Sequence, residues 1–159
     1  MTQVQLRPAV PTDFVPIVAL ERATEFAPHW PAATYAAILD TSAAQPRRCI
    51  FAAMKGETLV GFAVGLLHPS PGEAVQLAEL ESIAVDTNSR RLGIGRALCH
   101  AVLDWSRAHG ATEIILEVRA ASAGPIALYT ALGFTQTGRR PRYYRDPEDD
   151  ALAMRLPLS

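Results

Sequence analysis

The sequence predicts a mixed α+β domain whose sheet is mostly antiparallel and carries helices on its faces. Three observations support this expectation. Strand-like runs follow one another between residues 48 and 85, a long helical pattern covers 93–108, and strands and helices alternate from there onward. With 159 residues, of which 49% are hydrophobic, the chain can bury one core. We therefore expect a single domain over residues 1–159.

The N-terminal part is expected to form one short strand and two helices. The run VQLRPA predicts a strand over residues 4–9. Apolar residues at helical spacing predict a helix over 11–26, with Thr12 as its N-cap and Pro16 in its first turn. A second helix is expected over 32–39.

The central strands are expected to pair consecutively. RCIFAAM (48–54) and TLVGFAVGLL (58–67), joined by a turn at Lys55-Gly56, predict a β-hairpin. After the breaker-rich stretch HPSPGE, the run VQLAELESIAV predicts a third strand over 75–85.

The remaining elements alternate between helix and strand. Apolar residues recur every three or four positions from Ile94 to Trp105, so a helix is expected over 93–108, ending at His109-Gly110. The later elements are a strand, a helix that ends at a glycine, and two closing strands, expected over 113–118, 123–132, 134–138 and 151–156.

Charge and targeting patterns limit the classes of partner. Fifteen Lys and Arg residues face 16 Asp and Glu residues, so the chain as a whole does not favour nucleic acid or a membrane surface. The N-terminus lacks a charged segment followed by an apolar core, and no apolar run approaches the roughly 18 residues of a membrane span. We expect a cytoplasmic protein without a membrane partner.

Neither cysteines nor histidines indicate a metal site or a disulfide. Cys49 and Cys99 lie far apart and have no second thiol or histidine at metal-ligand spacing. The four histidines are isolated in the sequence: His29, His68, His100 and His109. We therefore expect no bound metal.

The stretch SRRLGIGRAL, residues 89–98, is a candidate anion site between a strand and a long helix. Free N–H groups and the helix dipole favour an anion at a helix N-terminus. Gly93 and Gly95 would let the anion approach the backbone, and Arg91 and Arg96 would add positive charge. The alternative is that the glycines only shape a tight turn. The stretch matches neither the Rossmann fingerprint nor the P-loop.

The order R-x-x-G-x-G, directly after IAVD and at the head of a long helix, resembles the acetyl-CoA loop of the GNAT N-acetyltransferases. LRPAVPTDFVPIVALE is similar to the first strand and helix of that family, and ALYTALGF to its last helix and the strand that follows. The resemblance covers essentially the whole chain. It implies the GNAT fold, a twisted sheet of about six to seven strands flanked by about four helices.

The resemblance also implies a binding site for acetyl-CoA. The loop would cradle the coenzyme pyrophosphate, and the preceding strand would pair with the pantetheine arm and polarise the thioester carbonyl through an N–H group. The residues that this implies are Ile83, Ala84, Val85, Arg90, Arg91, Leu92, Gly93, Ile94, Gly95 and Arg96. One group of the family, the RimI-type enzymes, commonly carries Ser-Asn where this chain has Ala121 and Ser122. We expect Ser122 to cap the next helix and to offer its hydroxyl to the coenzyme.

LEVR, IALY and the closing pattern Y-Y-x-x-P-x-x-D-A-x-x-M are most similar to the RimI-type enzymes. This narrower resemblance implies transfer of an acetyl group to the N-terminal α-amine of a ribosomal protein. An α-amine ordinarily has a pKa of about 7.7–8.0, against about 10.4 for lysine, so a carboxylate base can deprotonate it more easily.

Two residues are candidates for proton transfer. Strand alternation places Glu117 on one face with Ile115 and Arg119, where it would either pair with Arg119 or lie exposed at the end of the sheet. The resemblance implies instead that Glu117 is the general base, acting through a water. Tyr129 lies at the spacing of a core aromatic, and the resemblance implies that its hydroxyl protonates the leaving thiolate.

The acceptor groove is the part that the sequence specifies least. By alternation, Glu79 and Glu81 share a strand face with Ile83 and Val85, and they would face either solvent or the acceptor amine. The basic and aromatic segment 138–150 is expected to be a solvated hairpin between the last two strands. The resemblance places two of its residues, Tyr143 and Tyr144, along the acceptor groove.

Three hypotheses follow. The first is direct acetyl transfer from acetyl-CoA to a protein N-terminus, since Cys99 has no adjacent base that would make it a covalent carrier. The second is a GNAT enzyme that acetylates a small-molecule amine. The third is a non-catalytic module that binds acyl-CoA or associates with RNA. In each case we expect a monomer or a homodimer.

Overall fold

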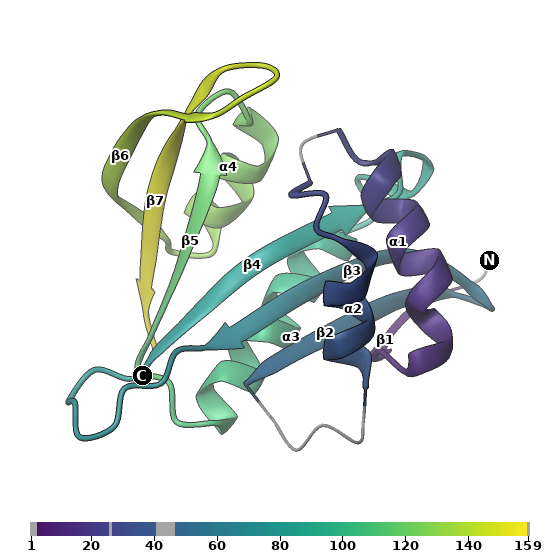
Figure 1. Cartoon of the computed structure of the whole chain (residues 1–159), viewed down its shortest axis with the longest axis horizontal. Helices are drawn as coiled ribbons and strands as arrows, with labels where there is room; N and C mark the ends of the chain where they lie inside the picture. Colours follow the sequence, from purple (N-terminus) through teal and green to yellow (C-terminus); the bar gives the residue numbers. More distant parts are fainter. Residues whose placement is uncertain (1–2, 26, 41–46, 159) are drawn as a thin grey trace.

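The computed structural model describes residues 3–25, 27–40 and 47–158. Its centre is a seven-stranded sheet with the strand order β1-β2-β3-β4-β5-β7-β6, and four α-helices cover its faces (Figure 1). The prediction of a mixed α+β fold with a mostly antiparallel sheet is confirmed. The strands are β1 (Val4–Pro8), β2 (Arg48–Lys55), β3 (Thr58–Leu67), β4 (Leu77–Val85), β5 (Glu113–Arg119), β6 (Thr135–Tyr144) and β7 (Asp149–Pro157). The helices are α1 (Phe14–Ala23), α2 (Ala32–Leu39), α3 (Ile94–Ala108) and α4 (Ala123–Ala131), with short 3-10 turns at Pro11–Asp13 and Thr87–Ser89.

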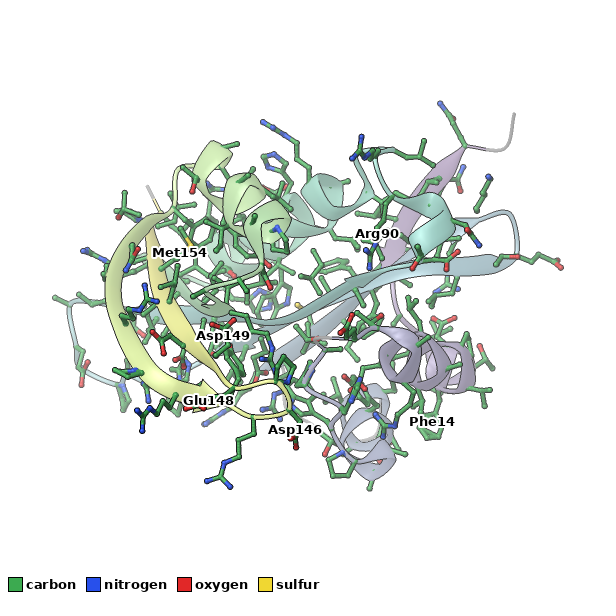
Figure 2. The ribbon with its side chains drawn as sticks, turned by 90° about the horizontal axis from the view of Figure 1, so that it is seen from above. Phe14, Arg90, Asp146, Glu148, Asp149 and Met154 are labelled. Atoms are coloured by element: carbon green, nitrogen blue, oxygen red, sulfur yellow. The ribbon has the colours of Figure 1, made fainter. Side chains whose placement is uncertain are left out.

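The helices form two layers around the sheet. Figure 2 shows α1, near Phe14, on one side of the central strands and Arg90 at the start of the α3 segment on the other. The apolar stripe of α3 packs Ile94, Leu98 and Val102 into the larger core. On the other side, a smaller core holds Ile17 of α1 and other buried residues of α2 and the sheet. Burial of one face of each helix holds both layers on the sheet.

The start of α1 differs from the expectation. Residues 11–13 form a 3-10 turn, and α1 begins at Phe14, so Thr12 is not the N-cap. The reason is Asp13, whose carboxylate accepts the N–H of Val10 at 2.8 Å and a bond from the Arg7 guanidinium at 2.7 Å. These bonds close the turn before the helix. Phe26, at the expected end of this helix, lies outside the described residues.

The strands β4 and β5 are the two parallel neighbours of the sheet, and they separate after a short contact. They pair only where Leu77–Glu79 meets Glu113–Ile115. Beyond these pairs they diverge, so that β5, β7 and β6 turn away from β1 to β4 (Figure 1). A gap between two neighbouring strands of one sheet exposes backbone groups that would otherwise pair. This divergence sets the position of the site described below.

A β-bulge at Glu81 corrects the expected faces of β4. Ser82 pairs with Val64 of β3 and Leu80 pairs with the next residue, Gly65, which leaves Glu81 as the extra residue. Leu80 therefore belongs to the core beneath α3, together with Ile83. Glu79 and Glu81 consequently do not share a face with Ile83 and Val85, because the bulge reverses the alternation that the sequence pattern assumed.

The segment after α4 also differs from the expectation. The strand β6 continues to Tyr144, well past the expected end at residue 138, and only residues 145–148 connect it to β7. Pro141 is tolerated because β6 is an edge strand with shifted register. Arg139 pairs with Asp150 of β7 at 2.6 Å. The basic and aromatic residues thus lie on a mostly exposed hairpin, as expected, but most of them belong to its first strand and not to its turn.

Candidate active site

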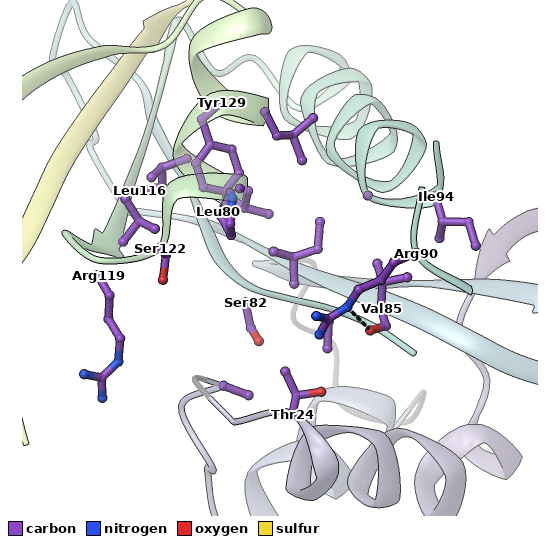
Figure 3. Close-up of a pocket in the computed structure, with 18 of the residues that line it drawn as sticks. Thr24, Leu80, Ser82, Val85, Arg90, Ile94, Leu116, Arg119, Ser122 and Tyr129 are labelled. Carbon is purple, nitrogen blue, oxygen red and sulfur yellow. Dashed lines mark hydrogen bonds between the residues drawn. The ribbon is translucent and has the colours of Figure 1, made fainter. Parts of the chain in front are cut away.

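A cleft of about 860 Å³ opens where β4 and β5 diverge (Figure 3). One wall comes from the loop between α1 and α2, which contributes Thr24 and Pro28, and the other comes from β5 and α4. Figure 3 shows Tyr129 and Thr24 on opposite sides of this space, with Ser82 of β4 between them. Two neighbouring strands that diverge in this way leave room for an extended ligand between the two strands.

One end of the cleft is suited to an anion. Arg90, Arg91 and Arg96 line it, and the first turn of α3 opens into it. The N–H of Ala97 is bonded to the carbonyl of Gly93 at 3.0 Å, so the N–H groups that precede it at the helix start have no acceptor within the helix. This arrangement of free amides and guanidinium groups fits a phosphate or pyrophosphate.

The two glycines of the loop have different structural roles. Gly93 has φ = 77°, in the left-handed region, so its backbone conformation itself favours glycine. Gly95 lies inside α3, where a Cβ atom would meet Leu128 at 3.5 Å, an ordinary contact. The fold therefore does not require glycine at position 95. Leu92, which the resemblance included in the loop, is 61% exposed and does not line the cleft.

The residues Ile83, Ala84 and Val85 line the cleft along β4. On their other side they pair with Gly61–Ala63 of β3, and within the described chain β5 pairs with none of them. Arg90 reaches back to this strand and donates a bond from Nε to the Val85 carbonyl at 3.4 Å (Figure 3). The free edge of β4 can thus accept an extended chain through backbone hydrogen bonds.

Glu117 lies on β5 and lines the cleft. Its side chain is 29% exposed, and its Oε2 atom, which is shielded from solvent, lies 3.0 Å from Nε of Arg140 on β6. The ion pair of Glu117 is thus with Arg140, whereas one of the alternatives from the sequence had paired it with Arg119. Arg119 points elsewhere and donates to the carbonyl of Pro147 at 2.8 Å.

Tyr129 of α4 lines the same cleft and is almost fully buried. Its ring meets Phe134 edge-to-face at 5.9 Å. Burial raises the pKa of Tyr129 above its ordinary value of 10.0, and the nearby Cys99 and Tyr144 act in the same direction. The hydroxyl is therefore neutral near pH 7 and can serve as a proton donor.

The two expected groove tyrosines point in different directions. Tyr144 lines the cleft, whereas Tyr143 is 50% exposed and lies outside it, because successive residues of a strand face opposite sides. Burial, followed by the charge of Glu117, raises the pKa of Tyr144 to about 12. The Arg119 guanidinium lies 4.4 Å from the Tyr144 ring centroid. Tyr144 therefore lies near both proton-transfer candidates, since it interacts electrostatically with Glu117 and with Tyr129.

Of the remaining candidates Glu79, Glu81 and Ser122, the structure places only Glu81 and Ser122 in the cleft. Glu81 lines the cleft and is paired with Arg48 at 2.7 Å, whereas Glu79 lies outside it and contacts His68 at 2.8 Å. Ser122 lines the cleft at the N-cap position of α4, but its hydroxyl makes no capping hydrogen bond.

Sequence reasoning missed the wall formed by the loop between α1 and α2. Thr24, Glu25, Ala27 and Pro28 of this loop line the cleft. The helical pattern had placed Thr24 and Glu25 inside the helix expected over 11–26, but α1 ends at Ala23 and both residues belong to the loop.

The described part of the chain contains no group of three or more His, Cys, Asp or Glu side chains arranged to hold a metal ion. It also contains no helix that is long and apolar enough to cross a bilayer.

Comparison with known proteins identifies the family. The acetyltransferase (GNAT) family model matches residues 16–134. The ribosomal protein bS18-alanine N-acetyltransferase of Escherichia coli strain K12 is 44% identical over 84 residues, which are 52% of this chain and 57% of that protein. The N-alpha-acetyltransferase RimI of Mycobacterium tuberculosis is 35% identical over 127 residues, 79% of this chain and 74% of that protein. The chain spans 33% and 57% of the lengths of two curated relatives that it matches.

Solved structures agree with the observed fold. The crystal structure of the ribosomal-protein-S18-alanine N-acetyltransferase from Escherichia coli superposes with a TM-score of 0.80 at 30% identity, covering 99% of this chain and 95% of that one. Arabidopsis thaliana NAA60 in complex with acetyl-CoA has a TM-score of 0.85 at 18% identity, covering 98% of this chain and 99% of that one. The second similarity concerns the fold alone.

Proposed function

The chain belongs to the acetyltransferase (GNAT) family, and from this we propose that it transfers the acetyl group of acetyl-CoA to the N-terminal α-amine of a protein. One observation carries the proposal. The cleft between β4 and β5 joins an anion-binding helix start to Glu117 and Tyr129, a carboxylate and a neutral phenol. The Mycobacterium tuberculosis relative is an N-alpha-acetyltransferase by name, and the Escherichia coli relative is a ribosomal-protein alanine N-acetyltransferase by name; both names support the same acceptor class here.

The anion end of the cleft is proposed to hold the coenzyme pyrophosphate. The free amides at the start of α3 would donate to its oxygens, and Arg91 and Arg96 would offset its charge. The exposed edge of β4 from Ile83 to Val85 would bind the pantetheine arm through main-chain hydrogen bonds. A β4 amide would then polarise the thioester carbonyl and stabilise the oxyanion that forms on it.

The proposed chemistry is direct transfer. Glu117, through a water, takes a proton from the ammonium form of the acceptor so that the neutral amine can attack the thioester carbon. Glu117 releases this first proton to solvent. A C–N bond forms, the nitrogen of the tetrahedral intermediate gives its second proton to Glu117 through the water, and the C–S bond breaks. Tyr129 donates its hydroxyl proton to the departing thiolate and is reprotonated from solvent. Arg140 holds the Glu117 carboxylate in its place beside the cleft.

We further propose that the acceptor begins with a small residue such as alanine, by analogy with the name of the Escherichia coli relative. A ribosomal protein is the corresponding acceptor for this chain. Such an acceptor and acetyl-CoA are both present in the cytoplasm, which is where we expect the enzyme to act.

The test is free-thiol release from acetyl-CoA with a panel of acceptors. The panel holds peptides with N-terminal Ala, Ser or Met, the same peptides with blocked N-termini, and small amines including polyamines. Release with free but not with blocked peptides is the expected result. Thiol release with small amines alone would show that the acceptor is a small molecule. No thiol release with any acceptor, although the coenzyme binds, would indicate a non-catalytic module.

A further inference from the structure

Glu21, in the last turn of α1, is a fully buried carboxylate that the proposed chemistry does not use. Its Oε2 atom accepts a hydrogen bond from the Tyr35 hydroxyl at 2.7 Å and another from the backbone N–H of Trp30 at 2.9 Å. Its Oε1 atom accepts a bond from the Arg22 guanidinium. An ionised group without solvent is stable only when such donors surround it, so this site is built around the carboxylate.

The bonds of Glu21 connect the two ends of the loop that lines the cleft. The backbone of Trp30 is held at both of its polar groups, because Glu21 accepts its N–H and Arg22 donates to its carbonyl at 2.6 Å. The Trp30 ring then packs on Tyr35 of α2 with centroids 5.4 Å apart. Between these fixed points lie the cleft-lining residues Thr24 and Pro28.

The same cluster reaches the sheet at the centre of the cleft. The Tyr35 ring meets Phe62 of β3 edge-to-face at 6.0 Å, and its hydroxyl lies beside that of Ser82 on β4. Ser82 lines the cleft and directly precedes Ile83. Through Tyr35, Glu21 therefore links the loop wall to the core that packs on β3 and β4.

We infer that Glu21 is a positioning residue for the acceptor: it fixes the wall formed by Thr24, Glu25, Ala27 and Pro28 at a set distance from β4. The wall lies across the cleft from Tyr129 (Figure 3). This inference rests on the proposed function. It assigns the wall to acceptor binding, so a loosened wall weakens acceptor binding and leaves coenzyme binding intact.

The experiment compares three variants of the full chain. Glu21→Ala removes all acceptor atoms of the cluster and is expected to raise the KM for the peptide about 10-fold, the effect of losing bonds to a buried charge. Glu21→Gln is expected to raise it less, because the amide oxygen can still accept from Tyr35 and Trp30. Tyr35→Phe removes one bond and keeps the ring. In all three, the Kd of acetyl-CoA, measured by calorimetry, is expected to change less than about twofold.

Asp13→Ala is the matched control. Asp13 is also buried and ion-paired, to Arg7, but it touches no part of the cleft wall. Asp13→Ala is expected to lose about as much thermal stability as Glu21→Ala, while its KM for the peptide stays unchanged. An equal rise of the peptide KM in Asp13→Ala, or an unchanged KM in every Glu21 and Tyr35 variant, would overturn the inference.

Amide hydrogen exchange separates this inference from the proposed function. Faster exchange at Trp30 is expected in Glu21→Ala, with unchanged exchange at the start of α3. If the wild-type protein acetylates no peptide, the proposed function fails. The comparison of amide exchange between wild type and Glu21→Ala, made with and without acetyl-CoA, still tests whether Glu21 fixes the wall. Unchanged exchange at Trp30 would overturn the anchoring role by itself.

Discussion

Arg140 Nε lies 3.0 Å from Glu117 Oε2, although the two residues are 23 positions apart and come from the non-adjacent strands β6 and β5. The Arg140 side chain is 63% exposed, whereas the Glu117 side chain faces the cleft. The ion pair thus brings an exposed cation of the edge strand to the proposed general base.

Replacing Arg140 by methionine keeps most of the side chain and removes its charge. Since an exposed ion pair contributes about 1 kcal/mol or less, the expected loss in kcat/KM is at most about fivefold. Steady-state kinetics at two ionic strengths measure it, because wild type and variant should converge at high salt. A loss of more than about 100-fold would show that Arg140 contacts the acceptor itself.

Glu117→Gln removes the proposed base and keeps the size of the side chain. We expect kcat/KM to fall by about 10²–10⁴, with the affinity for acetyl-CoA unchanged. Stopped-flow turnover and calorimetry supply the two numbers. Activity close to that of the wild type would show that another carboxylate is the base, and Glu81, which also lines the cleft, is a candidate.

Tyr129→Phe tests the proposed acid. Phenylalanine keeps the ring and its contact with Phe134, so the fold should persist while kcat falls by about 10²-fold or more. Because burial raises the pKa of Tyr129 above 10.0, its hydroxyl stays protonated through the alkaline range. The wild-type rate should therefore show no decline from Tyr129 ionisation below pH 10, as a pH–rate profile would reveal. A variant with full turnover would remove Tyr129 from the mechanism.

The two loop glycines should respond differently to alanine. Gly93→Ala places a Cβ on a left-handed residue, which costs about 1–2 kcal/mol, so the variant should be less stable. Gly95→Ala fits beside Leu128 and favours the helix, so thermal stability should stay the same or rise. Its acetyl-CoA affinity should nevertheless fall, because Gly95 lines the cleft proposed to hold the coenzyme and the new methyl group would take up space there. Unchanged affinity in Gly95→Ala would place the phosphates elsewhere.

Asp13 should make stability depend on pH in the acid range. Its hydrogen bonds to Arg7 lower its pKa below 3.8, so the folded state favours the charged form. The stabilisation is present above pH 3.8 and is lost as pH falls through the lower folded value. Urea unfolding of wild type and Asp13→Asn should give a difference that is constant near neutral pH and shrinks below about pH 4. A constant difference down to pH 2 would contradict this account.

Local patterns predicted the parts of the fold that depend on neighbours in sequence. The spacing from Ile94 to Trp105 located α3, and alternation placed Glu117 on the less buried face of β5. The bulge at Glu81 could not be predicted in this way, because it exists only in the register of β4 against β3. It changed the faces of two candidate residues.

The partners of the site residues were the least predictable part. Arg140 reaches Glu117 because β7 brings β6 and β5 together, an arrangement with no signal near either residue. The role of Glu21 likewise depends on Trp30 and Tyr35, which approach it only once α1 and α2 have packed on the sheet. The nature of each side chain was evident from the sequence, but its partner depended on the tertiary fold.

The most direct test of the central claim is the position of the acetyl group on one peptide that offers two amines. The peptide carries a free N-terminal alanine and an internal lysine, and it is incubated with acetyl-CoA and the protein at pH 7.5 and then fragmented in a mass spectrometer. The account predicts acetylation of the N-terminal α-amine, with the lysine unmodified. Acetylation of the lysine, or of neither amine while acetyl-CoA is bound, would contradict it.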